Sequence, residues 1–202
     1  MDTSEYAISE ASSLALESIT ACFFMSGSEA QNERSTLLSY AAAGTKHGNE
    51  FTLWMDPDMV LWIKSDSHRI GDLLLSDGQL HHVCVTWESS SGTSTVYKDG
   101  ALVKTIGNVM TGEQIKGGGI WVIGQDQDSV GAGFQAKDSF KGYVTQVNIW
   151  DRVIGSNEIK CFAKDSGSIM QGNYKAYSDF SVSSATQLIK SLCCPLAPIS
   201  EP

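Results

Sequence analysis

The sequence predicts an all-β protein that folds as an antiparallel β-sandwich with one short α-helix. Three observations lead to this fold class. Short runs of apolar, β-branched and aromatic residues recur along the chain with turn-forming residues between them, a pattern typical of sandwiches. One pair of runs has the sequence of a tight hairpin, and one segment has the residue spacing of an amphipathic helix.

The predicted strands follow one another from near the N-terminus to Trp150. In chain order they are residues 18–25, 36–41, 50–55, 59–65, 82–87, 94–98, 101–106, 119–124 and 142–150. The clearest hairpin is STVYKDGALVK, in which Asp99-Gly100 supplies the positive φ angles of a two-residue type I′ turn. In the strand HVCVTW, Val83 and Trp87 fall on one face and Cys84 on the other, because successive side chains alternate.

One helix is predicted after the last strand. Ser156 is a suitable N-cap residue. Ile159, Phe162 and Ala163 follow it at helical spacing, and Gly167 is the expected stop.

Length and charge exclude several classes of function. A chain of 202 residues suits one large or two small domains, and β-sandwiches of this size are commonly single. The net charge is −9, and Lys and Arg do not cluster, which argues against nucleic-acid binding and against adhesion to anionic membranes. No apolar run reaches the length of a membrane span.

The N-terminus MDTSEYAIS has no basic region followed by an apolar core, so it predicts no secretory signal. The chain is then either a mature form of a secreted protein or an intracellular protein. The cysteines decide between these two interpretations, and the chain has five of them.

The loop GQDQDSVGAGFQAKDSF, residues 124–140, is the strongest candidate for a binding site. Its oxygen-bearing side chains are Asp126, Gln127, Asp128, Gln135 and Asp138. Calcium takes six to eight oxygen ligands in flexible geometry, which such a loop can supply. The flanking segments are predicted strands, and the EF-hand pattern fails at its fifth and twelfth positions, so a calcium loop between strands is predicted. An ordinary solvated surface loop would have a similar composition.

Four linked motifs resemble the pentraxin family, the C-reactive protein and serum amyloid P-like domains. They are HVCVTWESSSG, YKDG, GQDQDSVGAGFQAKDSFKG and VNIWDRVIGSNEI, and they stand in pentraxin order and at pentraxin spacing. The resemblance runs from about Tyr6 to Ile189. It implies an extracellular jelly-roll sandwich, concanavalin- or laminin-G-like, over residues 1–192, with residues 193–202 as a C-terminal tail. It also implies a short or missing first strand and assembly into discs, most often pentamers.

The resemblance implies two calcium ions side by side in each subunit. By position, Asp126 stands where a bridging Glu is common, Gln127 offers its backbone carbonyl and Asp128 binds both ions. Gln135 and Asp138 complete the loop, and Asn49 comes from an earlier loop. The residue before it, Gly48, stands at a usual Asp, and this loss together with the shorter Asp126 is expected to weaken the first site.

Trp54 and Trp62 are the residues that the resemblance places beside the ions. A tryptophan can cover a quaternary ammonium or stack on a sugar. In a β-sandwich, a strand tryptophan is more often part of the core. A phosphate-bearing ligand or an acidic sugar is therefore expected in preference to phosphocholine.

The cysteines point to an oxidising compartment, because Cys22 and Cys84 match the family's conserved disulfide. Cys161 could pair with Cys193 or Cys194, leaving one thiol for a bond between chains. Zinc is the rival interpretation, but CxxC spacing is lacking.

The sequence as a whole predicts a secreted, calcium-dependent, lectin-like protein that binds phosphate-bearing small molecules or glycans as a homo-oligomer. The alternative is a structural or adhesion module with a relic calcium site. His82 belongs to the family signature, where the histidine is structural, and His81 is expected to be a polar strand-end residue. No catalytic arrangement follows a recognised nucleophile turn, so enzymatic activity is not expected.

Overall fold

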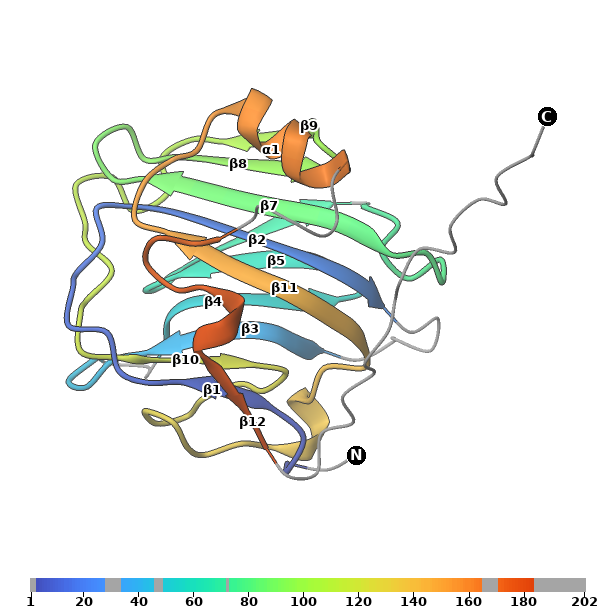
Figure 1. The fold of residues 1–202 in the computed structure, drawn as a ribbon. Coiled ribbons are helices and arrows are strands. Elements are labelled where there is room, and N and C mark those ends of the chain that lie inside the picture. Colours follow the sequence, from blue (N-terminus) through green and yellow to red (C-terminus); the bar gives the residue numbers. More distant parts are fainter. Residues whose placement is uncertain (1–2, 28–33, 46–48, 72, 165–170, 184–202) are drawn as a thin grey trace.

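Two antiparallel sheets packed face to face form the molecule, as the computed structural model shows for residues 3–27, 34–45, 49–71, 73–164 and 171–183 (Figure 1). One α-helix, α1 (Ser156–Lys164), lies on the outer face of one sheet. The predicted fold class, an all-β jelly-roll sandwich with one short helix, is confirmed.

The first sheet has seven strands. Their order across the sheet is β12 (Phe180–Val182), β1 (Ala7–Ser9), β10 (Ile120–Ile123), β3 (Ser35–Ala41), β4 (Asn49–Asp56), β5 (Asp58–Ile63) and β6 (Asp66–Gly71). The predicted shortening of the first strand is seen in β1, which has three residues and pairs with β12 on one side and β10 on the other. β12 therefore covers the edge that β1 would otherwise expose.

The second sheet has five strands. Their order is β11 (Gly142–Trp150), β2 (Ser18–Gly27), β7 (His81–Glu88), β8 (Thr93–Lys98) and β9 (Ala101–Ile106). β8 and β9 form the predicted hairpin, with Asp99 at φ 51° and Gly100 at φ 78°. These positive φ values are those that a type I′ turn requires.

Alternation along β7 divides its side chains between two apolar layers. Val83 and Trp87 share one face, as predicted, and lie with Val85 in the main core between the sheets. Cys84 points to the opposite face, where it packs with Ile159 of α1 and with Trp150. The stacked rings of Trp150 and Phe162, 5.6 Å apart, hold the helix against this face.

The start of the helix corrects one prediction. The Gly155 carbonyl accepts the first helical hydrogen bond, from the Ile159 N–H at 3.0 Å, so Gly155 and not Ser156 is the N-cap residue. Glycine is tolerated at this position because it adopts non-helical angles without strain. The expected stop at Gly167 and the predicted tail 193–202 lie outside the described residues.

The residue pattern located none of three strands of the first sheet. β1 and β12 have three residues each, which is too short for a periodic signal. β6 has the sequence DSHRIG and lies at the sheet edge with its polar side chains largely in solvent. Edge strands need no apolar run, because only one side of them pairs and little of them is buried.

The disulfide between Cys22 and Cys84 joins β2 to β7 across a separation of 62 residues, confirming the predicted pair. Replacing both residues by alanine is expected to lower the free energy of unfolding by about 4 kcal/mol, since the bond restricts the unfolded chain. Urea unfolding measures the loss. Cys161→Ser, at an exposed position of α1, is the control and should change stability by less than about 0.5 kcal/mol. A double variant as stable as wild type would contradict the expectation.

His82 is 1% exposed beside this disulfide, and its burial lowers the pKa to about 4 from 6.5, with Asp99 opposing the shift. As pH falls, His82 is therefore protonated in the unfolded chain before it is protonated in the folded protein. The histidine's contribution to stability is complete above about pH 6.5 and is lost as pH falls towards 4, up to about 3 kcal/mol. Urea unfolding at pH 7 and at pH 5 should show a smaller acid loss for His82→Gln than for wild type. His68→Gln, near the surface, should keep the wild-type loss; identical losses for all three proteins would refute the assignment.

Candidate functional site

The predicted calcium loop connects β10 to β11 and packs against β3. The Gly124 N–H donates to the Leu37 carbonyl at 2.9 Å, and the Phe140 N–H donates to the Gly124 carbonyl at 2.9 Å, which closes the base of the loop. A bridge between Thr36 and Ser139 ties its far end to β3. The loop is therefore a fixed part of the seven-stranded sheet's surface.

A tight turn brings the two halves of the loop together. Backbone hydrogen bonds join Ser129 and Ala132 in both directions, at 2.9 and 3.2 Å. Gly133 has φ 80°, and a Cβ atom there would lie 2.8 Å from the Cβ of Asp128. Glycine permits this close return, after which the short 3₁₀ helix Ala136–Asp138 places the last carboxylate near the first.

Asp126 is the centre of the candidate site and is 9% exposed. The Asn49 amide donates to its Oδ1 at 2.8 Å, and Arg34 Nη2 donates to its Oδ2 at 2.8 Å. Burial raises the pKa of this carboxyl. Arg34 and Asn49 oppose the shift, whereas the nearby charges of Asp138 and Asp128 add to it. The net direction is upward, as expected of a carboxylate held among others away from water.

The remaining predicted side chains lie around Asp126. Asp138, 8% exposed, has its Oδ1 3.9 Å from Arg34 Nε. Asp128 is exposed and accepts a hydrogen bond from the Gln135 amide at 2.6 Å. The fold thus brings together the acidic and amide side chains of Asn49, Asp126, Asp128, Gln135 and Asp138, while Gly48 lies outside the described residues.

Gln127 has a different environment from its neighbours. Its side chain is fully buried, and its amide nitrogen is 3.1 Å from the Ser39 carbonyl, the Ser39 hydroxyl and the Ile120 carbonyl. Its Oε1 accepts the Gly131 N–H at 2.8 Å. The side chain therefore anchors the loop to β3, and only the backbone carbonyl, the group predicted to face an ion, is available as a ligand.

The donor set fits calcium. Three carboxylates, two side-chain amides and one backbone carbonyl supply oxygens only, which a hard cation prefers. Asn49 Oδ1 is buried without a hydrogen-bond partner among the described residues. An orphaned buried acceptor is costly unless a donor or a cation satisfies it. This atom is the structural observation that favours a cation beside Asp126.

Trp54 and Trp62 lie together on adjacent strands β4 and β5, with ring centroids 5.8 Å apart. Both are half-buried and neither belongs to the main core, so the alternative of core tryptophans does not hold. The guanidinium of Arg34 lies 4.3 Å from the Trp54 ring centroid. Sequence reasoning missed Arg34, which no motif marks but which links the ring to the acidic cluster.

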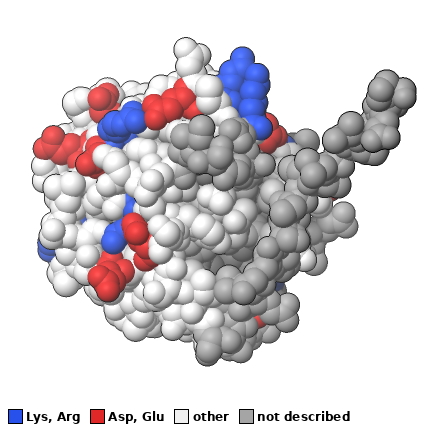
Figure 2. Space-filling view, viewed as in Figure 1, with Lys and Arg blue, Asp and Glu red and all other residues white. Residues whose placement is uncertain are grey.

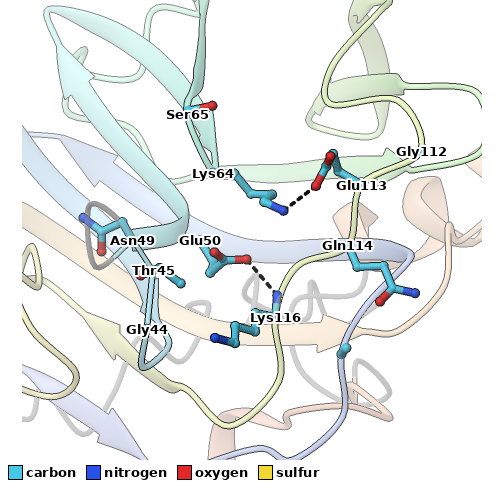
Figure 3. Close-up of a pocket in the computed structure, with 11 residues that line it drawn as sticks. Gly44, Thr45, Asn49, Glu50, Lys64, Ser65, Gly112, Glu113, Gln114 and Lys116 are labelled. Carbon is cyan, nitrogen blue, oxygen red and sulfur yellow. Dashed lines mark hydrogen bonds and ion pairs between the residues drawn. The ribbon is translucent and has the colours of Figure 1, made fainter.

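A polar cavity of about 750 Å³ adjoins Asn49 (Figure 3). The ion pair Lys64–Glu113, at 2.5 Å, lines it. The Glu50 carboxylate, 4% exposed, accepts the Lys116 N–H there at 2.8 Å. Its mixed charges and hydroxyl groups provide donors and acceptors for a polyhydroxylated or zwitterionic molecule.

Among the described residues, the cysteines and histidines form no metal site of comparable quality. Cys22, His82 and Cys84 lie close together, but the two sulfurs are joined in a disulfide and offer no thiolate. The His81 ring forms hydrogen bonds with Asp77 and Asp99 at the start of β7, as expected of a polar residue at a strand end. Cys161 is exposed and has no disulfide partner within the described ranges; its predicted partners Cys193 and Cys194 lie outside them.

Basic and acidic side chains are mixed on one face of the molecule. Figure 2 shows Lys and Arg interspersed with Asp and Glu on the face in view, without a continuous basic patch among the residues coloured there. In the described part of the chain, no helix combines the length and apolar character that crossing a membrane requires.

Gln127→Ala is expected to lower the free energy of unfolding by about 2 to 4 kcal/mol, because it removes the buried amide's hydrogen bonds to Ser39, Ile120 and Gly131. Thermal or urea unfolding in metal-free buffer measures the change. The matched control is Gln135→Ala at an exposed position, with an expected change below about 0.5 kcal/mol. Equal effects at the two glutamines would show that Gln127 does not anchor the loop.

Comparison with known proteins agrees with these features. The model of the Pentaxin family matches residues 2–185. The rat Sushi, von Willebrand factor type A, EGF and pentraxin domain-containing protein 1 is 36% identical over 176 residues, which cover 87% of this chain and 5% of that protein. Human neuronal pentraxin-2 is 36% identical over 169 residues, covering 83% of this chain and 38% of that protein. The chain therefore spans only a part of these relatives.

A solved structure supports the same fold. The native heptameric SAP-like pentraxin from Limulus polyphemus superposes with a TM-score of 0.76 at 24% identity, covering 90% of this chain and 93% of that one. Pentraxins are lectin-like recognition modules, typically calcium-binding, and are not enzymes. Family model, sequence relatives and architecture agree, and the chain belongs to the pentaxin family.

Proposed function

We propose that this chain is a secreted, calcium-dependent, lectin-like recognition protein that binds phosphate-bearing small molecules or glycans and acts as an oligomer. One observation carries the proposal: Asp126 and its neighbours form a cluster of carboxylates and side-chain amides in which the buried Asn49 Oδ1 has no partner among the described residues. Members of the pentaxin family are typically extracellular, which supports the proposed secretion of this chain.

Two calcium ions would share the cluster. Asp126 and Asp128 would bridge them, Asn49 and the Gln127 carbonyl would serve the first ion, and Gln135 and Asp138 the second. Bound calcium supplies a fixed positive charge for phosphate or sugar oxygens. Because Gly48 offers no carboxylate and Asp126 is shorter than Glu, the first ion would be held more weakly.

The aromatic pair would select the rest of the ligand. Trp54 and Trp62 are half-buried on the same sheet as the cluster, so a sugar face or an alkyl-ammonium group bound there would remain close to the ion. A glycan extending the other way from Asn49 would reach the polar cavity lined by Glu50 and Lys64. The tryptophan pair and the polar cavity both suit a polar ligand that is held at the ion by an anionic or hydroxyl group.

Assembly would raise the modest affinity of each site through avidity. The Limulus neighbour is heptameric, and we propose a ring, a pentamer by family precedent, for this chain. The rival function is a structural or adhesion module with a relic ion site. The glycine at position 48, the three extra cysteines and the much larger relatives support that rival.

The double variant Asp126→Asn/Asp128→Asn is expected to abolish calcium binding, measured by titration calorimetry at millimolar calcium. The control is Asp56→Asn/Asp58→Asn, which removes two carboxylates that pair with Arg69 and are not predicted ligands, and it should bind calcium like wild type. The wild-type protein should also gain thermal stability with calcium, because the ion binds only the folded state. No heat and no stabilisation in the wild type would exclude the calcium-dependent function.

Calcium-dependent retention on phosphate-bearing or glycan resins separates the two candidate functions, with sedimentation velocity as the check that each protein still assembles. Recognition through calcium predicts that the Asp126/Asp128 variant still assembles but loses calcium-dependent retention on phosphate-bearing or glycan resins. A structural module predicts that assembly and partner binding are unchanged by either the variant or calcium removal.

A further inference from the structure

We propose that Arg34 is a built-in counter-cation of the acidic cluster, which competes with calcium and covers Trp54 until calcium binds. This inference rests on the proposed calcium site and adds its regulation. It makes ion binding and exposure of the aromatic surface two consequences of one side-chain movement.

The position of Arg34 is the first argument. Its guanidinium donates to Asp126 Oδ2 at 2.8 Å, lies 3.9 Å from Asp138 Oδ1 and is 4.3 Å from the centre of the Trp54 ring. One planar group therefore neutralises two carboxylates and covers one ring, as guanidinium groups do well. The Arg34 side chain is 42% exposed, so it has room to move towards solvent.

The charge of the cluster is the second argument. Asp126, Asp128 and Asp138 contribute −3 and Arg34 contributes +1, which leaves −2. Asp126 and Asp138 are each less than a tenth exposed, so their repulsion is poorly screened by water. A metal-free cluster of this kind requires a cation, and among the described residues Arg34 is the basic side chain that reaches it.

Arg34 and calcium compete for Asp126 through charge. Asn49 donates to its Oδ1, and Arg34 donates to its Oδ2 at 2.8 Å. A calcium ion bridged by this carboxylate would lie beside the guanidinium, and two cations this close repel each other. Calcium binding therefore favours a position of Arg34 away from Asp126. Since the same group covers Trp54, the ring loses its cover in that step.

Titration calorimetry of Arg34→Gln tests the competition. Glutamine keeps a polar chain but removes the charge, and we expect the calcium dissociation constant to fall roughly tenfold relative to wild type, in the range of ordinary coupling between sites. The control is Arg69→Gln, an exposed arginine that pairs with Asp56 and Asp58 and should leave calcium affinity unchanged. Arg34→Lys, which keeps the charge without the planar group, should lie between wild type and Arg34→Gln.

Acrylamide quenching of tryptophan fluorescence tests the uncovering of the ring. The chain has five tryptophans, of which Trp87, Trp121 and Trp150 are 3% exposed or less, so quenching reports mainly Trp54 and Trp62. Calcium should increase quenching in the wild type. It should leave Arg34→Gln unchanged at an already raised value, and it should have no effect in Trp54→Phe.

The outcomes separate this inference from the proposed function. Equal calcium affinity in wild type and Arg34→Gln overturns the inference and leaves the calcium site standing. Binding by Arg34→Gln alone supports the inference and shows that the arginine has replaced the ion in the native protein. No binding by either protein overturns both, and binding by the wild type without any change in quenching overturns the uncovering of Trp54.

Discussion

The neutralisation of Asp126 is the constraint on which the functional surface depends. This carboxylate is held largely away from water, beside Asp128 and Asp138, and its charge needs a cation or several donors. Asn49 and Arg34 both donate to this carboxylate. Calcium would neutralise Asp126 with twice the charge of Arg34, and it would contact more of the surrounding oxygens. The site can therefore be understood as one negative cluster with two alternative cations, one supplied by the chain and one by the solvent.

The sandwich makes this arrangement possible by the order of its strands. β10, β3 and β4 are neighbours in the seven-stranded sheet. Asp126 follows β10, Arg34 precedes β3 and Asn49 begins β4, so residues up to 92 positions apart meet on one surface. Gln127 holds the loop to β3 through Ser39, and the close return at Gly133 brings Asp138 back towards Asp126. Rigid strands thus position a loop that would have little structure alone.

The sequence predicted the fold and much of the site, for identifiable reasons. Strands with apolar runs, the Asp99-Gly100 hairpin and the Cys22–Cys84 pair leave strong local or family signals, and all were confirmed. β6 left no such signal because an edge strand can be polar, and β1 and β12 are too short to show a period. Arg34 was missed because an isolated arginine between strands has no motif; only the tertiary structure shows that it faces Asp126 and Trp54. The calcium ligands themselves stay predictions.

A crystal structure of the protein grown with calcium tests the central claim most directly. We expect electron density for an ion within about 2.3–2.6 Å of oxygens from Asp126 and Asp128, with Arg34 withdrawn from Asp126 and the face of Trp54 open. Crystals grown with a chelator should show Arg34 on Asp126, near the 2.8 Å separation described above. An arginine still bonded to Asp126 in saturating calcium, with no ion in the cluster, would contradict the account.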